Sequence, residues 1–126
     1  MASGATAYTN SSVNATGQSV TAVPTKLCGA LLSNTNTTTT CWVKLYNKAT
    51  AATVGTDTPL VVIPVIFNSN VQEVFFGNAS GATSEDAGVL FSAGLSVGCT
   101  TNYLNSDTSA PVAGSMGVTL LYKVIG

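Results

Sequence analysis

The feature of this sequence that most limits its fold is an alternation of apolar with small or polar residues toward its C-terminal end. In the stretch GVLFSAGLSVGCTT, apolar side chains occupy every second position from Val89 to Cys99, and mostly small or polar residues stand between them. A period of two residues is that of a β-strand with one buried face. The stretch therefore predicts one long half-buried strand, or two strands joined by a bend at a glycine.

A second alternation runs from Met116 to Val124, with Thr119 and Lys123 among the residues on its opposite face. Because the apolar positions of both alternations fall on one side of a strand, they predict a set of core side chains. These are Val89, Phe91, Leu95, Val97, Val118, Leu120 and Tyr122.

Shorter apolar runs precede these two, at residues 27–32, 41–46, 60–67 and 71–76. Pro64 has no backbone N–H to donate to a strand ladder, so it predicts a sheet edge, a bulge or a break. Clusters of turn-forming residues separate the runs, and no stretch of ten or more residues shows a helical stripe. The sequence therefore predicts an all-β fold, an antiparallel β-sandwich that is jelly-roll-like.

The N-terminal part of the chain differs in composition from the rest. Residues 1–24 contain few large apolar groups and many alanine, serine, threonine, asparagine and glycine residues. Such a segment buries too little surface to offset its ordering entropy, which predicts an extended arm that is flexible or docked on a partner. Residues 25–126 are predicted to form the β-sandwich domain, which is long enough to bury a core.

The chain is almost uncharged. It carries four lysines, five acidic residues and neither arginine nor histidine, for a formal net charge of -1. No electrostatic field attracts phosphate backbones or acidic lipids, so we predict binding to neither nucleic acid nor membrane. A surface of hydroxyls, amides and small apolar groups is poor at repelling its neighbours, which suits a protein that packs against others.

Five carboxylates remain as candidates for acid–base chemistry. Asp57 and Asp107 lie in turn-like segments, where an aspartate commonly bonds its own backbone, and the parity of Glu73 predicts an outward side chain. Glu85 and Asp86 are adjacent in a loop of small residues, which is typical of solvated surface. Two of the five could form a glycosidase pair, which is the enzymatic alternative. We predict instead a protein that is not an enzyme, with no catalytic residue and no cofactor.

The cysteines do not indicate a metal site. Cys28, Cys41 and Cys99 are odd in number and widely spaced, and no histidine is present to complete a ligand set. We predict no bound metal, and free thiols that pack as small apolar groups in a reducing cytosol.

The lone tryptophan, Trp42, shares one face of a predicted strand with Tyr46, opposite the face that carries Val43 and Leu45. An exposed aromatic pair can stack on a sugar ring, which would make the pair a glycan contact. Alternatively, both faces of this strand are buried, or the pair fills a subunit interface, where Trp and Tyr are enriched. Trp42 and Tyr46 are therefore the candidate interface or glycan contact residues.

The segment WVKLYNKATAATVGTDTPLVVIPV resembles part of small virion proteins encoded by tailed bacteriophages and prophages. In those proteins an alternating strand of the form VKLYNKA leads through VGTDTP into an apolar strand that ends IPV. The later stretch from GVLFSAGLSVGC to the final strand is similar too, so the resemblance covers residues 40–126. It is most specific at KLYNKA and GTDTP. The cysteine in CWVKLYNK and the Ser/Thr-rich N-terminal segment depart from the pattern.

The resemblance implies a capsid decoration, or cement, protein of the jelly-roll type. Such a protein would be a homotrimer on the outer surface of the major capsid protein shell. It would be made in the host cytoplasm, in keeping with the lack of a secretory signal pattern at the N-terminus. The alternative is a tail fibre or baseplate module that recognises a host surface glycan through Trp42 and Tyr46.

Overall fold

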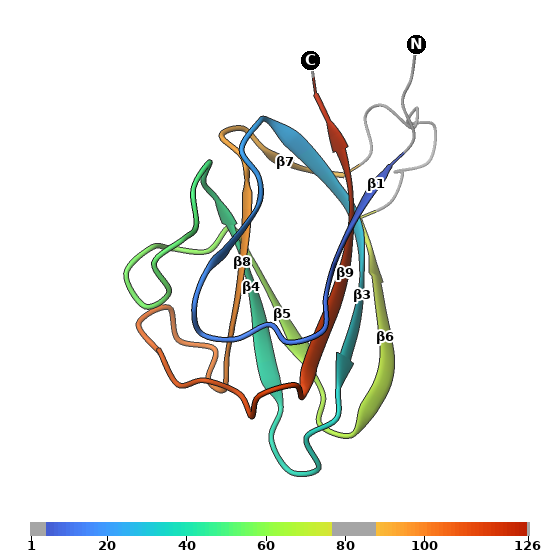
Figure 1. Ribbon diagram of the computed structural model, residues 1–126, viewed down its shortest axis with the longest axis vertical. Coiled ribbons are helices and arrows are strands. Elements are labelled where there is room, and N and C mark those ends of the chain that lie inside the picture. The colour runs from blue at the N-terminus through green and yellow to red at the C-terminus, as the bar shows by residue number, and fades with distance from the viewer. Residues whose placement is uncertain (1–4, 77–87, 126) are drawn as a thin grey trace.

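The computed structural model describes residues 5–76 and 88–125, and in these residues the fold is all-β, as predicted. The described residues contain no helix, and their strands form two antiparallel sheets packed face to face (Figure 1). The strands are β1 (Thr6–Asn10), β2 (Gln18–Thr21), β3 (Thr25–Asn34), β4 (Cys41–Asn47), β5 (Val61–Val65), β6 (Ser69–Phe75), β7 (Val89–Phe91), β8 (Leu95–Thr100) and β9 (Met116–Val124).

The strand order is that of a jelly roll. Sheet A has the order β1-β9-β3-β6, with the short β7 also paired to β3, and sheet B has the order β2-β8-β4-β5. With β7 set aside, the first strand pairs with the last, the second with the second-last, β3 with β6 and β4 with β5. The chain is thus one long hairpin rolled into two layers, so that its halves lie side by side throughout (Figure 1).

The core lies between the two sheets and follows the predicted alternation. Six of the seven predicted core side chains are at most 8% exposed, and Val89 is half-buried against them. In β4, Cys41, Val43 and Leu45 face the same core, as their parity indicates. Phe91 is fully enclosed.

The long alternation from residue 89 to 99 is two strands, the second of the two forms that it predicts. β7 belongs to sheet A and β8 to sheet B, and Gly94 lies in the bend between them with a φ of 152°. A Cβ atom at Gly94 would lie 2.7 Å from the carbonyl oxygen of Thr21. A side chain is therefore excluded by both the backbone conformation and the close approach of β2.

The arm predicted at residues 1–24 is not confirmed. β1 pairs with β9 at the edge of sheet A, and β2 pairs with β8 at the edge of sheet B. Between them Val13 is 2% exposed in the core, and its N–H donates to the carbonyl of Met116. Residues 1–4 lie outside the described residues. The segment is ordered because its backbone completes two sheet edges, which its own low apolar content did not indicate.

Pro64 lies on an edge strand, the first of the three outcomes that it predicts. β5 is the outer strand of sheet B and pairs only with β4 among the described strands. Pro64 is exposed and stands opposite Trp42 in the register of β4. Its missing N–H therefore costs the sheet no ladder bond.

Candidate interaction surfaces

The outer face of sheet B is covered by two of the chain's own loops. Residues 48–60, between β4 and β5, lie over one part of it, and residues 101–115, between β8 and β9, lie over another (Figure 1). Ser96 of β8 ties down the first loop, because its Oγ accepts from the Ala52 N–H at 2.9 Å and donates to the Gln18 carbonyl at 2.9 Å. Side chains that a two-layer sandwich would expose on this face are buried as a result.

Tyr46 is one of these side chains, and the structure does not place it at the surface as a glycan or interface contact would require. It is 1% exposed and packs against Ala52 and Val54 of the covering loop. Burial, together with the charge of Asp57, raises the pKa of its hydroxyl to about 12. The hydroxyl has no hydrogen-bond partner among the described residues. The structure thus shows the buried-strand alternative for this half of the Trp42 and Tyr46 pair.

Lys44 is buried under the second loop, although it lies on the outer side of β4. Its side chain is 0% exposed, and its Nζ atom donates to the carbonyl of Leu104 at 2.6 Å. Burial lowers its pKa, and the nearby charge of Asp107 works in the opposite direction. The ammonium group therefore holds the loop against the sheet.

Trp42 has a different aromatic neighbour from the one predicted. The half-buried indole lies beside Tyr103 of the second loop, with ring centroids 5.7 Å apart and planes tilted by 55°. Tyr103 is 61% exposed and the adjacent Leu104 is 48% exposed. The loop sequence gives no periodic signal for this pairing, which arises only because the loop folds back over β4.

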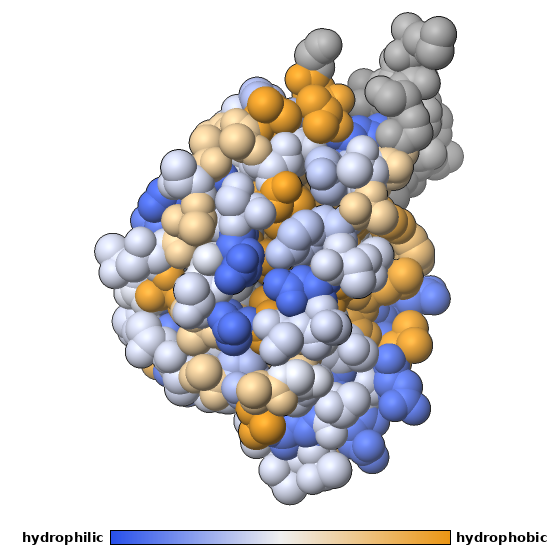
Figure 2. Space-filling view, in the orientation of Figure 1, coloured by the Kyte–Doolittle hydropathy of each residue, from blue (hydrophilic) through white to orange (hydrophobic). Residues whose placement is uncertain are grey.

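The outer face of sheet A has no such cover among the described residues. Its side chains are those that alternate with the core positions of β3, β6 and β9, and they include Leu31, Val71, Phe75 and Leu121. Val71 is 66% exposed and Phe75 is 61% exposed. Figure 2 shows apolar side chains along the margin on the side of β6, and others around the end of β9. Within residues 5–76 and 88–125, sheet A thus presents an uncovered face on which apolar and hydroxyl groups predominate.

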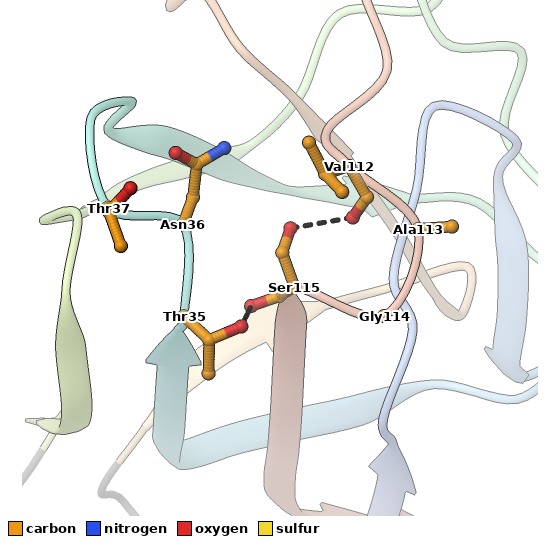
Figure 3. Close-up of a pocket in the computed structure, with 7 residues that line it drawn as sticks. All are labelled: Thr35, Asn36, Thr37, Val112, Ala113, Gly114 and Ser115. Atoms are coloured by element: carbon orange, nitrogen blue, oxygen red, sulfur yellow. Dashed lines mark hydrogen bonds between the residues drawn. The ribbon is translucent and has the colours of Figure 1, made fainter.

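A shallow hollow of about 300 Å³ lies at one end of the sandwich, between the β3–β4 turn and the residues before β9 (Figure 3). Its lining is Thr35, Asn36, Thr37, Val112, Ala113, Gly114 and Ser115. The Oγ atoms donate inward, from Ser115 to the Val112 carbonyl and from Thr35 to the Ser115 carbonyl. The Thr35 bond joins the two segments and the Ser115 bond lies within one of them, and the lining has neither an aromatic ring nor a charge with which to hold a ligand.

Of the three carboxylates that the structure describes, Asp57 and Asp107 accept hydrogen bonds within their own loops. Asp57 accepts from the Lys48 ammonium at 2.7 Å and the Thr53 N–H at 2.8 Å, and the lysine lowers its pKa. Asp107 accepts from the Ser109 hydroxyl, which lowers the pKa of its carboxyl group. Glu73 is exposed on β6, and Glu85 and Asp86 lie outside the described residues.

Two of the three cysteines are buried neighbours on the inner face of sheet B. Cys41 and Cys99 are both 0% exposed, and Cys28 is half-buried. The pKa of Cys99 is raised, because its thiol hydrogen-bonds to Cys41 and because burial disfavours the thiolate. No group of three or more metal-ligating side chains occurs within residues 5–76 and 88–125.

Comparison with known proteins adds no relative. No protein family, curated protein or solved structure matches this chain. In the part of the chain that the structure describes, no helix could cross a membrane.

Proposed function

We propose that this chain is a non-enzymatic structural virion protein of a tailed bacteriophage. Its role is that of a capsid decoration, or cement, protein, which binds the outer surface of the major capsid protein shell and stabilises it. The sequence resemblance over residues 40–126 supports this proposal, and that range holds strands β4 to β9.

The observation that carries the proposal is the difference between the two faces of the sandwich. Sheet B is covered by the chain's own loops, whereas no described segment covers the outer face of sheet A, whose exposed apolar residues include Val71 and Phe75. A face with exposed apolar groups is suited to lie on a neighbouring protein through many weak contacts. We propose that sheet A rests on the capsid shell.

The proposal includes self-association. A β-sandwich has edge strands that invite pairing, and this chain has few charges with which to guard them. A closed homo-oligomer covers equivalent patches without open-ended growth. Three-fold symmetry comes from the resemblance, and light scattering would test it by a mass near three chains.

The test is attachment to shells. Labelled protein is incubated with virions stripped of their outer proteins and located by electron microscopy. Two variants with equal original exposure give a matched comparison, because Val71 and Val112 are both 66% exposed. V71E should abolish decoration because it places a charge on sheet A, and V112E should leave decoration intact. Wild-type label at the tail, or no wild-type label on the stripped virions, would contradict the proposal.

A second candidate function is glycan recognition by a tail fibre or baseplate module. The observation that favours it is the Trp42–Tyr103 pair, whose tyrosine is 61% exposed. Asn102, Asn105 and Ser106 flank the tyrosine and supply groups that can bond sugar hydroxyls. A reproducible glycan-array signal that Y103A abolishes, with the fold intact, would support this function over the first.

A further inference from the structure

The edge strands that the structure describes are β1, β6 and the short β7 in sheet A and β2 and β5 in sheet B, and they are not equally protected against pairing with another chain. β7 has only three residues. β5 contains Pro64, which has no N–H to offer. β1 has five residues and β2 has four, and the pairing of β2 is irregular between Ser19 and Thr21. β6 has seven residues and no proline, and its pairing with β3 is regular from Gln72 to Phe75, with a register shift between Ser69 and Gln72. Of the described edges, β6 is the one best able to accept a further strand.

The outward side chains of β6 are apolar at two positions that flank a single charge. Val71 and Phe75 are 66% and 61% exposed, and Glu73 stands between them on the same face. The ring of Phe75 lies over β3, since a Cβ atom at Gly29 would lie 2.8 Å from its Cδ1. The Phe75 ring is thus held against β3, whereas Val71 stands exposed near the other end of β6.

We propose that β6 binds β6 of a second copy of this chain, in an antiparallel pairing centred on Glu73. In this register Val71 lies opposite the second copy's Phe75, and Phe75 lies opposite the second copy's Val71. Two apolar pairs therefore form. A centre on Gln72 would place Val71 opposite the second copy's Glu73 instead. Aromatic and β-branched cross-strand pairs stabilise a sheet, so the pattern of β6 selects the centre on Glu73.

Glu73 limits the strength of this pairing. In the selected register it faces its own copy across the two-fold axis, and like charges directly opposite each other oppose pairing. On the described outer face of sheet A, the other charged residues are Lys26 and Lys123. In the sheet register Lys26 of β3 lies opposite Lys123 of β9, whereas Glu73 of β6 lies opposite Leu31 of β3. The lysines therefore do not stand between the two carboxylates.

This inference rests on the proposed function only in that both require self-association. It names the strand and the residue that control one contact. The pairing has two-fold symmetry, so it is distinct from the three-fold association proposed above. It also leaves the outer face of sheet A free, because strands join edge to edge.

The experiment measures self-association of the purified full chain by light scattering and native mass spectrometry, so it needs no virion. E73Q should pair about two- to five-fold more tightly than wild type, so its mean mass should reach that of the pair at a correspondingly lower concentration. E73K should not pair with itself, but mixed with wild type it should form mixed pairs in preference to either homo-pair. Only a register with residue 73 opposite residue 73 gives that result.

Two controls separate the pairing from a change in net charge. D107N removes the same charge from the loop outside sheet B and should leave the mass unchanged. V71T combined with E73Q should lose the gain, because threonine keeps the β-branched shape and removes the apolar contact. Circular dichroism confirms that each variant is folded. The proposal is overturned if E73Q associates no better than wild type, if mixed pairs with E73K fail to form, or if D107N has the same effect.

Discussion

The side chain of Lys44 carries a positive charge in a place that water does not reach. It is hydrogen-bonded to the Leu104 carbonyl rather than to a carboxylate, so its burial is only partly offset. Tyr46, two positions along the same face, is buried with its hydroxyl unpaired. At the scale of single residues, covering sheet B costs free energy because it buries the Lys44 charge and the unpaired Tyr46 hydroxyl.

Replacing Lys44 by methionine should stabilise the protein by about 1 kcal/mol at pH 7, because a buried charge is replaced by an apolar chain of similar length. The advantage should shrink as pH rises toward 10.5, the ordinary pKa of lysine. The sign follows from the lowered folded pKa of Lys44. The unfolded wild type binds more protons in that range, so its free energy of unfolding rises with pH. Urea unfolding of both proteins at several pH values would measure the difference, and a strongly destabilised K44M at pH 7 would contradict this account.

Replacing Tyr46 by phenylalanine should cost almost nothing, or stabilise by about 1 kcal/mol, because the lost hydroxyl has no partner. The same change should reduce the loss of stability above pH 10. With the folded pKa raised to about 12, the unfolded tyrosine ionises first and draws the equilibrium toward unfolding. Thermal or urea unfolding checks both effects. A loss of more than 1 kcal/mol at pH 7 would mean that the hydroxyl binds a buried water.

Replacing Phe91 by alanine should destabilise the protein by about 3–5 kcal/mol, because the side chain is fully enclosed between the sheets. Its neighbour Leu90 points to the other side and is 51% exposed, so L90A is the matched control and should cost less than about 1 kcal/mol. Similar losses in the two variants would reverse the assignment of faces in β7.

At the scale of elements, β1 and β2 contribute backbone rather than apolar side chains. Each completes one edge, and the link between them carries Val13 into the core. The link also runs close to the loop over sheet B, since a Cβ atom at Gly17 would overlap the carbonyl of Ala52. The N-terminal segment is thus a structural part of both sheets.

Deletion of residues 1–24 should abolish cooperative unfolding, because it uncovers the edges of β9 and β8 together. A milder test compares V13A with V23A, where the original side chains are 2% and 42% exposed. V13A should cost about 2 kcal/mol, and V23A should stay within about 0.5 kcal/mol of wild type. If the truncated chain melts cooperatively near the wild-type temperature, these strands are dispensable.

The elements that could be predicted from the sequence are those that bury their own apolar stripe. The alternations of β4, β8 and β9 indicate strand, face and core correctly, because period two is a local property of the chain. The order of β1 and β2, and the covering of Lys44 and Tyr46, depend on contacts with distant segments. No local pattern indicates these contacts, and a loop that covers a sheet has the same composition as one in water.

At the scale of the whole molecule, the low charge should make attachment to shells insensitive to salt. The chain carries only nine charged side chains apart from its termini, and the exposed face of sheet A is mostly apolar and hydroxyl-bearing. Screening weakens interactions between exposed charges and leaves apolar contacts intact. Binding to stripped shells should therefore change less than about threefold between 50 and 500 mM salt. A steep fall with salt, in a co-sedimentation assay, would point to charged contacts.

The rolled hairpin also determines at what stage of synthesis the chain can fold. β3, at the centre of sheet A, has β9 as its neighbour, and Thr25 bonds the carbonyl of Lys123, 98 residues later. Such a high contact order makes folding slow compared with helical proteins of the same size. A ribosome must release nearly the whole chain before the central pair of this sheet can form. A prematurely terminated chain would leave β3 without its neighbour, so only complete copies could reach a folded state and take part in assembly.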